Sequence, residues 1–134
     1  MAMKMVIGLK SGKVAQKELD ASLMKVVLGK KLGETFKADG LGFAGYEFTI
    51  TGGSDDCGFP MRSDVAGFSR KKLLFVKGVG LKETEHGIRH RKTVCGSVVS
   101  PKITQLNVKV AKEGKESIEP PAKPEGEAKP AAKA

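Results

Sequence analysis

Short runs in which apolar and polar residues alternate constrain the fold of this chain more than any other feature. A period of two sends successive side chains to opposite faces of a β-strand. The alternation is clearest at residues 46–51 and recurs at 3–9 and 105–110. The apolar run at 73–77 is nearly continuous, which predicts a strand buried on both faces. Further short strands are expected at 14–19, 34–37 and 91–94.

One helix is expected between Asp20, which can cap its first turn, and Gly29, which can end it. The fold class that follows is mainly β with one short α-helix, a small barrel-like or rolled sheet of roughly six to seven short strands. Because every aromatic residue lies between Phe36 and Phe75, the core is expected to centre there.

A change of composition after about Lys112 divides the chain. The stretch 119–130 holds four of the six prolines and no aromatic residue, so it cannot bury enough apolar surface to offset the entropy of ordering it. We therefore expect one β-barrel-like domain at 1–112. A disordered tail, rich in Pro, Ala, Glu and Lys, is expected at 113–134.

The positive charge of the chain is gathered in one segment. The formal net charge is +9, and residues 69–112 hold eleven Lys and Arg against only Glu83 and Glu85. Such a concentration of cations repels itself unless a polyanion neutralises it, which favours nucleic-acid binding. The segment's one aromatic residue is Phe75, so stacking on single-stranded bases is not supported. Recognition of the backbone and shape of structured RNA is favoured instead.

The candidate RNA contacts are basic residues in and around this segment. Alternation along the strand expected at 91–94 would place Arg89 and Arg91 on one face and His90 and Lys92 on the other. The full set of candidates is Arg62, Arg70, Lys71, Lys72, Lys77, Lys82, Arg89, His90, Arg91, Lys92 and Lys102.

The loop at 52–62 is the most unusual stretch of the chain. It follows a strand and holds three glycines, as a phosphate-binding loop would, but it lacks the Gly-Lys-Ser/Thr ending of a P-loop. Asp55 and Asp56 suggest acid–base chemistry or a metal, although adjacent acids in such a loop are more often turn formers that bond their own backbone. Phe59 is expected to turn into the core, and Arg62 to point outward, suited to a phosphate.

A zinc site would have to be built from His86, His90, Cys95 and Cys57. Zinc accepts two Cys and two His, but its usual motifs pair the cysteines closely, and these stand 38 positions apart. A catalytic pair of Cys95 and His90 has no third member. We therefore expect no enzyme activity, no cofactor and no metal, and two free thiols in a reducing compartment.

Several motifs together are similar to those of one protein family. They are Ile-Thr-Gly-Gly-Ser-Asp at 50–55, Gly-Phe-Pro-Met-Arg at 58–62, Asp-Val at 64–65, Lys-Gly-Val-Gly at 77–80 and Arg-Lys-Thr-Val at 91–94, with Gly96 following. Over about residues 3–110 the sequence resembles the S6e family of archaeal and eukaryotic small-subunit ribosomal proteins.

That resemblance implies a β-barrel-like domain docked on ribosomal RNA, without catalysis or a cofactor. Cys95 stands where another basic residue would be expected, and the tail lacks the long basic extension with clustered serines of eukaryotic members. The tail therefore looks archaeal, and no regulation by tail phosphorylation is expected. The RNA contacts that the resemblance implies are Arg62, Arg70, Lys71, Lys72, Lys77, Lys82, Arg89, Arg91 and Lys92.

The function favoured by the charge and by the resemblance is that of a structural constituent of the small ribosomal subunit, acting in translation. The expected partners are the ribosomal RNA of that subunit and neighbouring ribosomal proteins, and the isolated chain is expected to be monomeric. A free-standing RNA- or protein-binding regulatory module is the alternative. An enzyme or zinc protein, using Asp55 and Asp56 or His86, His90 and Cys95, would leave the charge asymmetry unexplained.

The expected address is the cytoplasmic ribosome. No run approaches the roughly 18 consecutive apolar residues of a transmembrane helix. The first residues also lack the apolar stretch and cleavage site of a signal peptide. No contact with a membrane is therefore expected.

Overall fold

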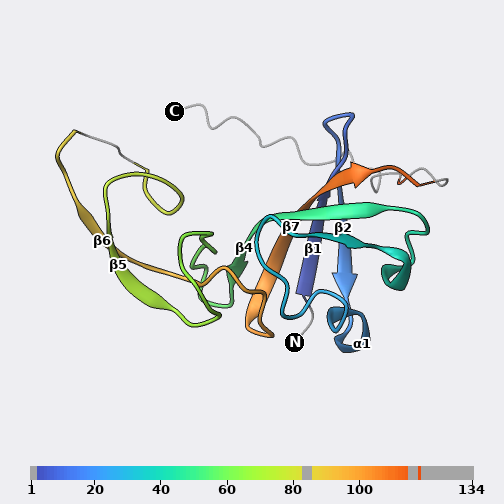
Figure 1. Cartoon of the computed structure of the whole chain (residues 1–134), viewed down its shortest axis with the longest axis horizontal. Helices are drawn as coiled ribbons and strands as arrows, with labels where there is room; N and C mark the ends of the chain where they lie inside the picture. Colours follow the sequence, from blue (N-terminus) through green and yellow to red (C-terminus); the bar gives the residue numbers. More distant parts are fainter. Residues whose placement is uncertain (1–2, 83–85, 115–117, 119–134) are drawn as a thin grey trace, which may run out of the picture.

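The computed structural model describes residues 3–82, 86–114 and 118. Over this part of the chain, seven strands form two sheets beside one short α-helix and one 3-10 helix. Figure 1 shows the larger sheet on one side of the molecule and a separate two-stranded hairpin on the other. The predicted fold class, mainly β with one short α-helix, is confirmed.

Five strands form the larger sheet in the order β2-β1-β7-β4-β3. They are β1 Met3–Gly8, β2 Val14–Leu19, β3 Thr35–Lys37, β4 Glu47–Asp55 and β7 Ile103–Lys112. The hairpin consists of β5 Lys71–Phe75 and β6 His90–Val94. The helices are α1 Ala21–Met24 and the 3-10 helix Asp39–Leu41.

The centre of the large sheet joins the two ends of the folded region. β1 runs parallel to β7, with Met5 opposite Leu106 and Ile7 opposite Val108. The other pairs in the sheet are antiparallel. Side chains directly opposite each other lie on the same face, so the alternating apolar residues of β1 and β7 cover one face together.

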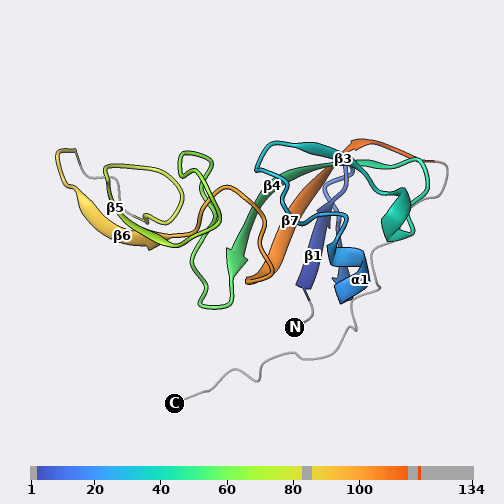
Figure 2. The ribbon, with the colours of Figure 1, turned by 60° about the horizontal axis from the view of Figure 1, so that its bottom comes forward.

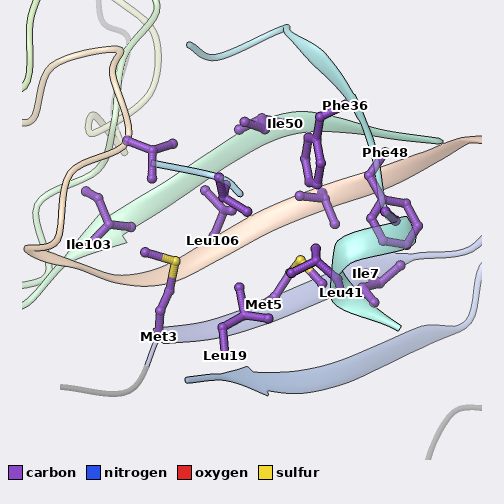
Figure 3. Close-up of a cluster of buried hydrophobic side chains, with 14 of the residues drawn as sticks. Met3, Met5, Ile7, Leu19, Phe36, Leu41, Phe48, Ile50, Ile103 and Leu106 are labelled. Atoms are coloured by element: carbon purple, nitrogen blue, oxygen red, sulfur yellow. The ribbon is translucent and has the colours of Figure 1, made fainter. Parts of the chain in front are cut away.

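That apolar face forms the core, which Figure 3 shows as a layer of side chains on β1, β4 and β7 with contributions from β2 and β3. Phe48 is fully buried and meets Phe36 edge-on, with ring centroids 6.0 Å apart. Leu41 of the 3-10 helix closes the layer at one end. Full burial of each such side chain stabilises the fold by about 1.5–3 kcal/mol.

The aromatic residues divide between the two parts of the molecule. The four from Phe36 to Phe48 pack in the core of the large sheet. Phe68 is 69% exposed, and Phe59 and Phe75 are half-buried. The expected core between Phe36 and Phe75 is therefore only partly right. Phe59 also does not reach the core to the extent expected.

The helix is shorter than the sequence predicts. α1 ends at Met24, and turns carry the chain to Gly29, whose φ is +81°. Asp20 occupies the N-cap position, but its side chain makes no capping hydrogen bond. Met24 and Val27 are both buried, so the apolar face packs on the sheet even where the helix has given way to turns.

The sheet does not close into a barrel within the described residues. β2 and β3 are its two edges, and they are not hydrogen-bonded to each other. The segment between the helix and β3 instead curls over one corner, where Gly29 N–H donates to Val99 O at 3.0 Å and Gly33 N–H to Ile50 O at 2.8 Å. These bonds bend the chain over the sheet without joining its edges.

The expectation that the 73–77 run forms a strand buried on both faces is wrong. β5 ends at Phe75, and Leu74 and Val76 are 58% and 49% exposed. The physical reason is that, within the residues that the structure describes, β5 pairs with β6 alone and no third strand or second layer covers the outer face of the hairpin. Figure 2 shows the hairpin extending away from the large sheet.

Contacts with the large sheet continue just beyond β7. Gly114 lies against the Ala44 carbonyl and the Tyr46 ring, and Ile118 packs on the core. The greater part of the tail predicted at 113–134, including all of 119–134, lies outside the described residues.

Candidate nucleic-acid interface

The hairpin has two faces of different character. Leu73 lies opposite Lys92 and Phe75 opposite His90, which places these four side chains on one face. Leu74 lies opposite Arg91 on the other face, and both are exposed. The predicted separation of Arg91 from His90 and Lys92 is confirmed.

Seven of the candidate cations lie on this hairpin or in the connection between its strands, and an eighth, Lys102, directly precedes β7; we call these eight together with the hairpin the basic arm. All eight side chains are exposed, and none forms an ion pair with a carboxylate in the described part of the chain. In the large-sheet region some cations pair with carboxylates, as Lys4 does with Glu18 and Lys30 with Glu34, and others, such as Lys13, have no such partner among the described residues. The eight are Lys71, Lys72, Lys77, Lys82, Arg89, Arg91, Lys92 and Lys102.

Arg62 behaves differently from these eight, and the prediction that it points outward is wrong. Its side chain is only 11% exposed. Nη2 donates to Asp64 Oδ2 at 2.5 Å, Nη1 donates to Val79 O at 3.0 Å, and the guanidinium carbon lies 4.2 Å from the centre of the Phe75 ring. Arg62 therefore fastens the turn after β5 to the loop that precedes β5. The same hydrogen bond and charge hold the pKa of Asp64 below its usual range.

Arg70 is also engaged inside the protein. Its Nε donates to Asp55 Oδ2 at 2.5 Å, and Nη2 donates to Asp56 Oδ1. Its side chain keeps 36% of its surface exposed, at the edge of the basic arm. The paired carboxylates raise the pKa of Arg70 further above its usual value, although partial burial opposes them.

Asp55 acts as the turn former that the sequence favoured. Its Oδ1 accepts hydrogen bonds from the backbone N–H groups of Cys57 at 2.9 Å and Phe59 at 3.1 Å. Burial alone would raise the pKa of this carboxyl, but the hydrogen bonds from Arg70, Phe59 and Cys57 outweigh it and lower the pKa. The ionised carboxylate thus ties the tip of the loop at 55–59 to the start of β5.

The loop then joins the two sheets. Cys95 N–H donates to Pro60 O at 2.9 Å, and Arg62 N–H donates to Cys95 O at 3.2 Å. Glycine is required where β4 enters this junction, because a Cβ on Gly53 would lie 2.6 Å from the carbonyl oxygen of Gln105. The sequence motif at 50–62 is therefore a structural junction, and no phosphate cradle forms in it.

The candidate zinc ligands do not come together. Within the described residues, the one group of potential ligands near enough to share an ion is Asp55, Asp56 and Cys57, and both carboxylates are occupied by Arg70. Cys95 is buried, and burial raises the pKa of its thiol, whereas Cys57 and His86 are exposed. This distribution supports neither a zinc site nor an activated Cys95 nucleophile.

Comparison with known protein families assigns the chain to one of them. The family described as ribosomal protein S6e matches residues 3–123, which include both sheets and the junction between them. The chain belongs to the ribosomal protein S6e family.

Its relatives in this family are archaeal proteins named small ribosomal subunit protein eS6. The one from Methanosphaera stadtmanae is 47% identical over 77% of this chain and 79% of its own length. Those from Methanocaldococcus jannaschii and Methanothermobacter thermautotrophicus are 41% and 40% identical, over 81% and 89% of this chain and 81% and 94% of their own lengths. The resemblance predicted from the motifs is confirmed.

In this S6e protein the structure sorts the predicted site residues into three groups. Eight cations are exposed on the basic arm, whereas Arg62 and Arg70 are held by Asp64, Asp55 and Asp56. His90 is half-buried on the face of the hairpin that it shares with Phe75. RNA contact by any of them remains a prediction.

The sequence patterns did not identify Phe68 as a candidate site residue. Its ring is 69% exposed beside the basic arm, where it lines a hollow with Arg70 and Lys102. Nothing in the local pattern distinguishes it from a core aromatic, because its exposure follows from the path of the loop that carries it. None of the helices in the described part of the chain is long and apolar enough to cross a membrane.

Proposed function

We propose that this protein is a structural constituent of the small ribosomal subunit and that its basic arm binds the ribosomal RNA of that subunit. The family supports the ribosomal role, since the curated relatives carry the name small ribosomal subunit protein. The proposed partners are this RNA and neighbouring ribosomal proteins, and the proposed place of action is the ribosome in the cytoplasm. The role requires no catalysis.

The observation that carries the RNA-binding proposal is the set of eight exposed cations without a carboxylate partner in the described residues. Like charges crowded on a two-stranded hairpin repel one another and weaken a structure that has little packing to hold it. A polyanion removes that repulsion and gains from the release of its counterions. The arm is therefore stabilised by the partner that it binds.

The arrangement of the cations favours a structured RNA over a flat anionic surface. Arg91 and Lys92 lie on opposite faces of β6, so one surface cannot meet both. An arm with cations on two faces fits between RNA strands, where phosphates lie on either side. Lys77 and Lys82 extend the charge along the turn beyond β5.

The proposal is tested by the salt dependence of binding to small-subunit ribosomal RNA. The plot of log affinity against log salt should be steep, with each neutralised phosphate contributing a slope of about −0.7 to −0.9. Replacing Arg89, Arg91 and Lys92 by Ala should make the slope shallower by about two to three. Circular dichroism should show that the variant keeps its β content.

A matched variant separates the arm from total charge. Lys13, Lys25 and Lys37 are exposed cations of the large-sheet region, and none has an ion-pair partner among the described residues. Replacing these three by Ala removes the same charge and should leave the slope nearly unchanged. Equal effects of the two triple variants would contradict the proposed binding face, and an affinity for RNA that does not respond to salt would contradict the function itself.

A further inference from the structure

A hollow of about 320 Å³ opens where the basic arm meets β7. Phe68, Arg70 and Lys102 stand around it, and Cys95 and Ser100 lie in its wall. Its volume is at the lower end of the range for small-molecule sites. It combines an exposed aromatic ring, cations and a buried hydroxyl, and the structural role of the junction accounts for Arg70 but not for Phe68, Lys102 or the Ser100 hydroxyl.

The Phe68 ring is held in its exposed position by the backbone. Ser97 N–H donates to Val65 O at 2.8 Å, and Val98 N–H donates to Gly67 O at 3.1 Å. This close approach needs Gly96, because a Cβ there would lie 1.9 Å from Gly67 O. The fold thus fixes the backbone beneath a ring that it leaves 69% exposed. A ring on a backbone fixed in this way has only its own side-chain rotations to lose when it stacks on a ligand.

Ser100 supplies a second, independent feature. The residue is only 7% exposed, and its Oγ has no hydrogen-bond partner among the described residues. A buried hydroxyl without a partner costs about 1–3 kcal/mol. Ser100 lines the hollow, and its Oγ has almost no accessible surface, so the side chain must rotate before a polar edge of a ligand seated there can hydrogen-bond with it.

The charge around the hollow suits an anionic ligand backbone. Asp55 also lines it, and Arg70 is hydrogen-bonded to both Asp55 and Asp56, so one guanidinium balances one of their two negative charges. Lys71 and Lys102 are exposed nearby and have no carboxylate partner among the described residues. Phosphates on either side of a planar group in the hollow would therefore meet cations.

We propose that this hollow receives one unpaired base of the ribosomal RNA, stacked on Phe68 with its polar edge at Ser100. Unpaired bases in bulges and loops are the usual targets of base recognition in RNA, and stacking on aromatic side chains is sequence-tolerant. The inference rests on the proposed function and deepens it. One extruded base in the hollow would fix the position of the RNA along the basic arm.

The structure also distinguishes this hollow from its neighbour. Phe68 and Ser100 also line a second, apolar hollow of about 300 Å³, together with Leu28, Val98 and Val99. That hollow suits an apolar side chain of a protein partner and offers no charge to a phosphate. Of the two hollows, the first alone is lined by Arg70 and Lys102, so the base and its flanking phosphates belong there.

The test uses two RNA hairpins with the same stem, one fully paired and one carrying a single bulged adenosine. The full-length protein should bind the bulged hairpin about 5- to 100-fold more tightly, from the stacking of one base. Phe68→Ala should abolish this preference and leave the affinity for the paired hairpin unchanged. Leu74 is an exposed apolar residue on the outer face of β5, so Leu74→Ala should change neither the preference for the bulged hairpin nor the affinity for the paired one.

Direct contact can be read from a fluorescent variant. The chain contains no Trp, so Phe68→Trp introduces a single indole at the hollow. Its fluorescence should be quenched by the bulged hairpin and scarcely affected by the paired one. Ser100→Ala should weaken binding to the bulged hairpin about 2- to 10-fold without lowering the Tm of the free protein, because it removes a hydroxyl that has no partner there.

Equal affinity for the two hairpins, with no quenching of the indole in the Phe68→Trp variant, would overturn the base-binding proposal and leave RNA binding by the arm intact. If Phe68→Ala spares both RNA affinities and instead impairs assembly into subunits, the site binds a protein and the proposal is equally overturned. Failure of the unmodified protein to bind either hairpin at low salt would refute the proposed function together with this inference.

Discussion

Asp55 is the residue at which the two sheets of this S6e protein are fastened together. Its side chain is 1% exposed and accepts hydrogen bonds from two backbone N–H groups and from Arg70. Buried carboxylates are stable only when their oxygens are bonded, because an ionised group without partners is costly to remove from water. Asp55 meets that condition and thereby fixes the path of the chain from β4 to β5.

The acid stability of the protein should depend on Asp55. The folded state holds the pKa of this carboxyl below its usual value of about 3.9, so the group stabilises the fold fully above that pH. This stability is lost as the pH falls through the lower pKa of the folded state. Denaturant unfolding followed from pH 7 to pH 2 should therefore show a loss of stability below about pH 4.

Replacing Asp55 by Asn should remove part of this pH dependence and lower stability at pH 7 by about 1–3 kcal/mol, since the amide cannot ion-pair with Arg70. Asp20→Asn makes the same change at a residue whose side chain forms no capping hydrogen bond, and it should leave the profile nearly unchanged. A pH profile of Asp55→Asn that overlays the profile of the unmodified protein would contradict this role.

At the scale of elements, two adjacent glycines of β4 provide a test of the strand junction. A Cβ on Gly53 would lie 2.6 Å from Gln105 O on β7 and 3.0 Å from Met61 Sδ, whereas a Cβ on Gly52 would meet nothing within 4 Å. Gly53→Ala should therefore force β4 and β7 apart locally and cost about 1–3 kcal/mol. Gly52→Ala should stay within about 0.5 kcal/mol of the original stability in urea unfolding. Equal losses in the two variants would show that the close approach is not what requires glycine.

The sequence predicted where the strands lie better than how they pair and what covers them. Alternation located the strands because the period of two is local, and Phe48, Ile50 and Leu106 are buried as their spacing indicates. The parallel pairing of β1 with β7 was not foreseen, because it joins residues about a hundred positions apart. The 73–77 run was misread because apolar composition alone does not say whether a second layer covers a strand.

The charge pattern of the sequence predicted where the cations gather, but not which of them pair with carboxylates. The spacing of cations along 70–92 correctly located the exposed basic arm. Arg62 and Arg70 were predicted as RNA contacts together with the other cations. In the folded protein, however, Arg62 pairs with Asp64, and Arg70 pairs with Asp55 and Asp56. No pattern in the sequence pairs Arg70 with carboxylates some fifteen positions earlier, because the loop between them sets their approach.

At the scale of the whole molecule, the protein has a stable part and a weakly supported part. The large sheet buries a continuous apolar layer, whereas the basic arm is a two-stranded hairpin with an exposed outer face. A hairpin of this kind is marginal in water by itself, and it is attached to the rest of the molecule by the side chains of Arg62 and Arg70 and by the backbone hydrogen bonds of Cys95. The part with least internal support thus carries the densest group of cations without a carboxylate partner among the described residues.

This division predicts two rates of amide hydrogen exchange in the full chain. Amides within β4 and β7 should exchange only through global unfolding, whereas those between β5 and β6 should exchange at least about tenfold faster through local opening. Small-subunit ribosomal RNA should slow exchange in β5 and β6 and leave β1 and β2 unaffected, because the bound polyanion removes the repulsion that favours opening. Exchange measured by NMR with and without RNA checks both statements. If β5 and β6 are as protected as β7 in the free protein, the hairpin does not depend on a partner, and the link between its charge and its stability fails.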